Sequence, residues 1–297
     1  MADQREQAAL LLVLRDSGRS WAEVAMAVED AGSAIAVLDE LLTPEQPTLD
    51  HVERDLAAEV GLLAREIESW AGEGIRLVTL LDKDYPVQLM LVHQRPPFLT
   101  YRGSLDPQDE RSVAVVGSRA ASPRGLSRTR ELATELAQAG WTVVSGLAAG
   151  VDTAAHRAVL DAGARTVAVI GTGLRHGYPA ENAELQQEIG RTGAVLSQFW
   201  PDTGPAKHQF PMRNAVMSGC ASATVVVEAG EHSGARIQAR VALEHGRHVF
   251  LTPEVVHGTN WGQAMAQRPN TTVLENPGHV LKVLDELIAE APDLIQL

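Results

Sequence analysis

An arginine stands in a glycine turn that follows the apolar run VAVV (113–116). The chain continues GSRAASPRG, so Gly117 and Arg119 lie between a predicted buried strand and a predicted helix. Such a turn presents the unpaired N–H groups of a helix N-terminus to an anion, and glycine lets the backbone approach a phosphate closely. The GxGxxG pattern of dinucleotide-binding proteins is missing here. The segment therefore predicts a phosphate site of another kind.

Three further loops share this richness in glycine and small residues. They are SGLAAGVDTAAH (145–156), GTGLRHGYPAEN (171–182) and EAGEHSGA (228–235), and each follows an apolar β-branched run. In an open sheet of parallel strands, such loops meet at the carboxyl edge, where ligands bind. We therefore expect the four loops to converge on one phosphate-binding rim. The alternative is that their glycines serve only the geometry of tight turns.

Basic side chains gather on the same segments. The first loop and its helix carry Arg119, Arg124, Arg128 and Arg130. In KHQFPMRN (207–214), Lys207 and Arg213 flank Phe210. A lysine three residues before a phenylalanine can place a cation on a phosphate and a ring under a base. The alternatives are a solvated arginine face and a phenylalanine in the core.

Catalytic signatures are weak by comparison. The sequence has no GxxxxGK[ST], HExxH or CxxC motif, and its histidines have no metal-ligand spacing. Asp152 and His156 are four residues apart at a predicted helix start, where Asp152 is expected to cap the helix. Glu228 could be a general base or a carboxylate that holds its loop. No acid–base pair emerges, so we expect a protein that is not an enzyme and has no cofactor.

Short β-branched runs alternate with helical stretches from residue 111 onward. The predicted strands are 113–116, 141–144, 166–170, 194–196, 224–227 and 248–251. Apolar strands separated by helices imply a parallel sheet covered on both faces. The fold class is therefore α/β, a Rossmann-like, doubly wound and mainly parallel sheet with a small N-terminal all-helical domain.

Three regions are expected along the chain. Residues 1–74 form the helical domain, because apolar residues recur at i, i+3, i+4 and i+7 from Trp21 and again, less completely, from Leu56; TPEQPT (43–48) interrupts them. Residues 75–110 form a connector with β-like runs at 75–80 and 98–101. Residues 111–297 form the Rossmann-like domain.

Charge is distributed unevenly over the 297 residues. The net charge is −13, but residues 1–75 carry 16 acidic and 5 basic side chains, whereas residues 111–247 carry 11 and 14. The local field decides which ligands a surface attracts, so the total does not exclude a nucleic acid. One cysteine, Cys220, excludes an internal disulfide and fits a reducing compartment. The acidic N-terminus predicts neither signal peptide nor membrane segment, and hence a cytoplasmic protein.

Taken together, these motifs resemble the DNA-processing protein A family (DprA, also called Smf). The resemblance runs through VAVVGSRAAS, WTVVSGLAAGVDTAAHRAVLDAG, TVAVIGTGLRHGYPAENAEL, FPMRNAVMSG and VVVEAGEHSGARIQARVALEHGR, over about residues 80–252. It implies a homodimeric protein that binds and protects single-stranded DNA and loads a RecA-type recombinase in transformation or recombination. On this resemblance, the turn at Arg119 holds backbone phosphates of a single strand.

The resemblance also implies the residues of the site. Positions matching the family's motifs are Gly117, Ser118, Arg119, Ser145, Gly146, Gly171, Lys207, Phe210, Arg213 and Asn214. Further candidates are Arg124, Arg128, Glu228, Ser233 and Gly234. Three departures from the family pattern, at Ala215, Gln198 and the pair Glu254–Val255, bear on affinity and recombinase loading more than on the fold.

One alternative function is a nucleotide-binding sensor or phosphoribohydrolase-like protein, a class that includes proteins of phage defence. Such hydrolases carry a PGGxGTxxE loop, whereas this chain has EAGEHSGA at that place. This difference argues against hydrolysis more than against nucleotide sensing. A further alternative is an interaction scaffold that acts through the acidic N-terminal helices.

Overall fold

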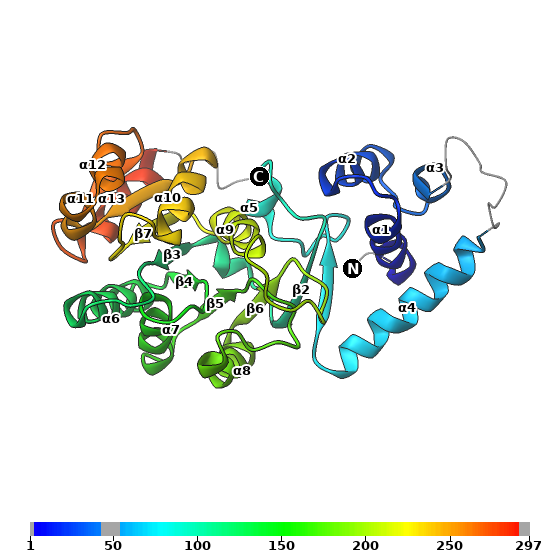
Figure 1. Ribbon diagram of the computed structural model, residues 1–297, viewed down its shortest axis with the longest axis horizontal. Coiled ribbons are helices and arrows are strands. Elements are labelled where there is room, and N and C mark those ends of the chain that lie inside the picture. Colours follow the sequence, from blue (N-terminus) through cyan, green and yellow to red (C-terminus); the bar gives the residue numbers. More distant parts are fainter. Residues whose placement is uncertain (1–2, 43–53, 291–297) are drawn as a thin grey trace.

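A mostly parallel sheet forms the centre of the computed structural model, which describes residues 3–42 and 54–290 (Figure 1). Within that part of the chain the sheet has nine strands in the order β1-β2-β6-β5-β4-β3-β7-β8-β9. The strands are β1 (Arg76–Thr79), β2 (Phe98–Gly103), β3 (Ser112–Val116), β4 (Thr142–Ser145), β5 (Thr166–Val169), β6 (Ala194–Ser197), β7 (Ala223–Val226), β8 (His248–Leu251) and β9 (Thr271–Val273).

The predicted fold class is confirmed. All six predicted strands form as β3 to β8, and every pair among them is parallel. The two β-like runs of the connector form β1 and β2, which extend the sheet antiparallel beyond β6. Strand β9, which pairs with β8 at the other edge, was not expected. Its threonines are only partly buried, so its sequence lacks the apolar pattern of the central strands.

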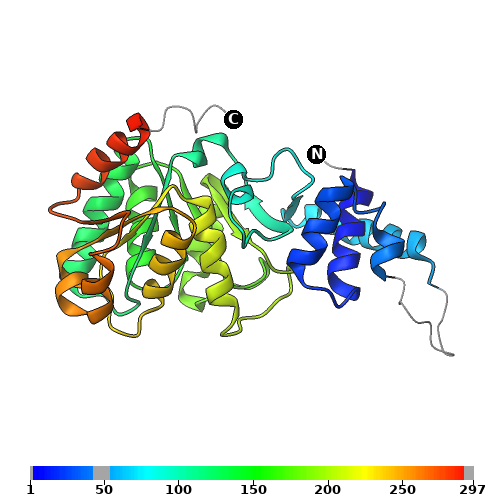
Figure 2. The ribbon, with the colours of Figure 1, turned by 90° about the horizontal axis from the view of Figure 1, so that it is seen from above.

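Helices cover both faces of the sheet (Figure 2). On one face lie α6 (Pro123–Gln138), α7 (Val151–Asp161), α8 (Ala183–Thr192) and α13 (His279–Glu290); on the other lie α5 (Val87–Met90), α9 (Gln209–Cys220), α10 (Gly234–Glu244), α11 (Pro253–Gly258) and α12 (Asn260–Met265). The side chains of β3, β4 and β7 alternate between the two apolar cores, which is why these strands are apolar throughout. The helices that follow β3, β4 and β5 lie on one face, and those that follow β6, β7 and β8 lie on the other. The winding of the sheet therefore reverses between the neighbouring strands β3 and β7.

The N-terminal helices are α1 (Gln4–Asp16), α2 (Trp21–Ala31), α3 (Leu38–Leu42) and α4 (Leu56–Gly72). Their apolar faces agree with the predicted periodicity, and TPEQPT lies outside the described residues. The core of these helices continues into the sheet, with the rings of Trp21 and Phe98 5.5 Å apart and those of Trp70 and Trp200 6.0 Å apart. The division into three regions stays a prediction. No helix in the described part of the chain is long and apolar enough to cross a membrane.

Candidate functional site

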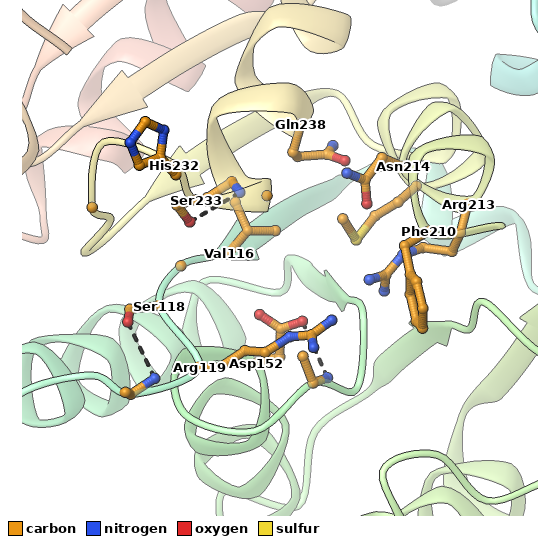
Figure 3. Close-up of a pocket in the computed structure, with 17 residues that line it drawn as sticks. Val116, Ser118, Arg119, Asp152, Phe210, Arg213, Asn214, His232, Ser233 and Gln238 are labelled. Atoms are coloured by element: carbon orange, nitrogen blue, oxygen red, sulfur yellow. Dashed lines mark hydrogen bonds between the residues drawn. The ribbon is translucent and has the colours of Figure 1, made fainter. Parts of the chain in front are cut away.

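A cavity of about 530 Å³ opens at the carboxyl edge of the sheet, between β3 and β7 (Figure 3). This is the point where the winding of the sheet reverses, which is where open α/β sheets bind ligands. The lining residues are Val116, Gly117, Ser118, Arg119, Ala120, Ala148, Asp152, Phe210, Arg213, Asn214, Met217, Gly230, His232, Ser233, Gly234, Ala235 and Gln238. The cavity volume lies within the range of roughly 300–1,000 Å³ that is usual for ligand sites.

The first glycine loop is held rigidly against β7. A Cβ at Gly117 would lie 2.6 Å from Val151 Cγ2 and 2.8 Å from the carbonyl oxygen of Glu228, so only glycine fits. Ser118 N–H donates to that same carbonyl at 2.6 Å. The Glu228 carboxylate accepts from the Ser122 N–H at 2.8 Å and from the Ser122 hydroxyl at 2.5 Å. Glu228 therefore clamps the loop and is not among the residues that line the cavity.

Arg119 and Phe210 form the mouth of the cavity. The guanidinium carbon of Arg119, an exposed residue, lies over the Phe210 ring, 5.5 Å from its centroid. The ring packs directly on Gly171, where a Cβ would come within 2.9 Å of its Cδ1 atom. The Tyr178 ring, from the same loop as Gly171, lies 5.6 Å from the Phe210 ring. A cation and an aromatic ring thus lie together at the mouth, a combination that proteins use to bind single-stranded nucleic acids.

Beneath this mouth, Arg213 and Asp152 are buried. Arg213 donates from Nη1 to the carbonyl of Val169 at 2.8 Å, and a Cβ at Gly146 would overlap its guanidinium. The Asp152 carboxylate accepts from the N–H groups of Gly146 at 3.1 Å and Ala148 at 3.3 Å. Burial raises the pKa of Asp152 and lowers that of Arg213, and each charge partly offsets the shift of the other. The Asp152 carboxylate thereby holds the second loop, and the nearby charge of Arg213 favours its ionised form.

The expectation that Asp152 caps its helix is wrong. The N-cap of α7 is Gly150, which has no side chain to accept a hydrogen bond, and Asp152 lies in the first turn. Its carboxylate turns back to the preceding loop because the unpaired N–H groups there are within reach. Nor do Asp152 and His156 form a hydrogen bond, since His156 Nδ1 is 2.7 Å from Thr166 Oγ1 on β5.

His156 makes folding sensitive to acid. Burial, followed by the positive charge of Arg213, lowers its pKa from 6.5 to about 3. Between these values the unfolded chain binds a proton that the folded chain does not, so the free energy of unfolding falls as pH falls, by up to about 1.4 kcal/mol per unit. We expect His156→Gln to remove this component, about 1.6 kcal/mol between pH 6.5 and pH 5. Urea unfolding at both pH values measures it; equal losses in both proteins would contradict the prediction.

The structure brings most of the predicted site residues together. Eight line the cavity: Gly117, Ser118, Arg119, Phe210, Arg213, Asn214, Ser233 and Gly234. Gly146 lies directly against the Arg213 guanidinium, and Gly171 against the Phe210 ring. Ser145 is buried, and its hydroxyl donates to the Val115 carbonyl at 2.6 Å. Lys207 is exposed in the loop before α9 and is not among the lining residues. Arg124 and Arg128 also lie outside the cavity, paired with Glu254.

Sequence reasoning missed Gln238 and His232. Gln238 lines the cavity from α10 with 1% of its surface exposed, and neither amide atom has a hydrogen-bond partner among the described residues. Figure 3 shows its amide opposite that of Asn214 on α9. The available signal was a glutamine on the helix face that otherwise carries buried alanines and a valine. His232 belongs to the fourth loop, whose convergence on the rim was predicted.

The fold and this cavity define the class of protein: a Rossmann-like α/β protein with a cavity at the topological switch point of its sheet. A family model described as DNA recombination-mediator protein A matches residues 76–286. Two relatives are the DNA processing proteins DprA of Streptococcus pneumoniae, 43% identical over 175 residues, and of Bacillus subtilis, 36% identical over 192 residues. These alignments cover 59% and 64% of this chain, and 62% and 65% of the relatives.

Solved structures agree with the family match. The X-ray structure of DprA from Streptococcus pneumoniae aligns with a TM-score of 0.74 at 30% identity, covering 94% of this chain and 97% of that one. A structure concerned with the single-stranded DNA binding mode of DprA from Helicobacter pylori aligns with a TM-score of 0.62 at 26% identity, covering 71% and 96%. The chain belongs to the DNA processing protein A family, and the expected resemblance is confirmed.

Proposed function

We propose that this protein binds single-stranded DNA at the cavity between β3 and β7. The observation that carries the proposal is the exposed Arg119 guanidinium stacked on Phe210 at the mouth of that cavity. A guanidinium contributes a cation and planar donors for phosphate, and a phenyl ring stacks with any base. Bases in a duplex are already stacked and paired, so a ring platform favours a single strand.

The relatives support this assignment. The Helicobacter pylori protein with the same fold is described by its single-stranded DNA binding mode. In this chain, Lys207 and His208 are exposed just before α9, three and two residues before Phe210. They extend the basic surface beyond the cavity mouth and would contact the backbone on either side of a bound base.

We further infer that the protein hands the bound strand to a RecA-type recombinase, acts as a homodimer in the cytoplasm, and has no catalytic activity. Support for recombinase loading comes from the family's description as a recombination mediator. Support for a non-catalytic role comes from the cavity, because its carboxylate, that of Asp152, is engaged by backbone N–H groups. Light scattering tests the homodimer, and a RecA filament-nucleation assay tests recombinase loading.

Binding is tested by fluorescence anisotropy with a labelled dT oligonucleotide over a salt series, beside a duplex of equal length and a mononucleotide. We expect preference for the single strand, and a log–log slope against salt of about −0.7 for each phosphate contacted. Lys207→Ala should make the slope shallower by about that amount. Thermal stabilisation by the mononucleotide, without oligonucleotide binding at low salt, would instead favour the nucleotide sensor.

A further inference from the structure

A three-residue ion cluster lies beside the cavity without being part of it. Arg124 and Arg128 stand one turn apart on α6, the helix that follows the Arg119 loop. Arg124 Nη2 is 3.1 Å from one carboxylate oxygen of Glu254, and Arg128 pairs with the other oxygen. Glu254 is in the first turn of α11. One carboxylate therefore bridges two guanidiniums that come from a different part of the chain.

The cluster belongs to the same edge of the sheet as the cavity. Glu254 follows β8, the neighbour of β7, at its carboxyl end. Arg128 lines a small crevice there together with Thr252, the residue after β8. The α6 N-cap, Ser122, is bound by Glu228 at the end of β7, so the start of α6 is tied to the loop that carries Arg119. The two arginines therefore follow the Arg119 loop directly, in the first two turns of α6.

Glu254 is a replaceable partner for these arginines. The Arg124 side chain is 77% exposed, and an ion pair so open to solvent contributes little to stability. The Arg128 and Glu254 side chains are less open, at 26% and 33%, but both still reach solvent. Partial burial raises the pKa of Glu254, but backbone hydrogen bonding and the two guanidiniums bring that pKa below its usual value, so the group is ionised. A phosphodiester offers two oxygens to the same donors, and arginine binds phosphate in the bidentate way it binds carboxylate.

We infer that Arg124 and Arg128 form a second DNA-phosphate site and that Glu254 occupies it as an internal competitor until the strand displaces it. The inference rests on the proposed function, because it places the second site on the path of a single strand that enters the cavity. Glu254 then weakens binding twice: it must be displaced, and once displaced its charge remains close to the phosphate.

The test compares Glu254→Gln with Glu188→Gln by anisotropy with the dT oligonucleotide. Glu188 pairs with Arg157 across α7 and α8, at 2.5 Å, so its replacement also removes one negative charge and frees one arginine, but away from this edge. We expect Glu254→Gln to bind roughly two- to tenfold more tightly at low salt, with a salt slope steeper by about 0.7 for each phosphate gained. Glu188→Gln should match the parent.

A second background separates site competition from general charge. In the Arg124→Ala/Arg128→Ala protein, Glu254→Gln should change affinity no more than Glu188→Gln does. A gain of the same size in both backgrounds would overturn the inference, as would no gain in the parent background. If the parent protein does not bind single strands at all, the proposed function fails first, whereas salt-sensitive parent binding that Glu254→Gln leaves unchanged overturns this inference alone.

Discussion

Replacing Asp152 with alanine is expected to lower the free energy of unfolding by about 3–5 kcal/mol, the usual cost of leaving a buried charge without its partner. Asp152 is 5% exposed and the neighbouring Arg213 6% exposed. Alanine would remove the countercharge of Arg213 and also the acceptor for the Gly146 and Ala148 N–H groups. Because these groups build the second loop, single-stranded DNA binding should be lost together with stability.

Asp152→Asn separates the two causes. Its side-chain oxygen still accepts from the loop N–H groups, but it carries no charge. We expect it to lie between the parent and Asp152→Ala in urea unfolding at pH 7. If both variants unfolded at the same urea concentration as the parent, the Asp152 charge would not stabilise Arg213, and other contacts would hold the loop.

Arg119→Ala is expected to weaken single-stranded DNA binding roughly ten- to hundredfold at low salt, since a charge-assisted hydrogen bond contributes about 1.5–3 kcal/mol and each 1.4 kcal/mol is tenfold. Arg119 is exposed and its guanidinium is on Phe210, so its loss should leave the fold intact. Anisotropy over a salt series measures the change, and a shallower salt slope should accompany it.

Arg191→Ala is the matched control. Arg191 is an exposed arginine at the end of α8, just before β6 begins, and hence at the amino edge of the sheet. The Arg191→Ala substitution therefore removes the same charge, but at the edge of the sheet opposite the cavity. Equal losses in both variants would mean that only net charge matters. Arg119→Lys tests the geometry, because lysine keeps the charge but lacks the planar group that lies on the ring.

The six central strands, β3 to β8, were predictable because they are short, β-branched and buried almost throughout. Val113 and Val115 face one core, while Ala114 and Val116 face the other, so the burial that the structure imposes is written into consecutive residues. Parallel pairing then puts every loop that follows a strand at one edge. This rule was enough to bring Gly117, Ser233 and Gly234 to a common cavity.

The roles of individual side chains were less predictable. Arg213 and Arg119 are both arginines in expected DNA-binding motifs, yet Arg213 is buried behind Gly146 and bound to the Val169 carbonyl, while Arg119 is exposed. Gln238 gave no motif at all, and only the close approach of α9 and α10 brings its amide to the cavity. Such roles depend on contacts between distant segments, which local patterns do not encode.

The amino-acid sequence by itself therefore determined the α/β class, the positions of β1 to β8, the glycine loops at one edge and the family. Its hydrophobic periods and turn residues act over a few neighbours, and that range is sufficient for these features. Only the tertiary structure decided which cations are free. Glu254 is 126 residues beyond Arg128 along the chain and yet neutralises it, because the Glu254 side chain at the start of α11 reaches the Arg128 side chain on α6.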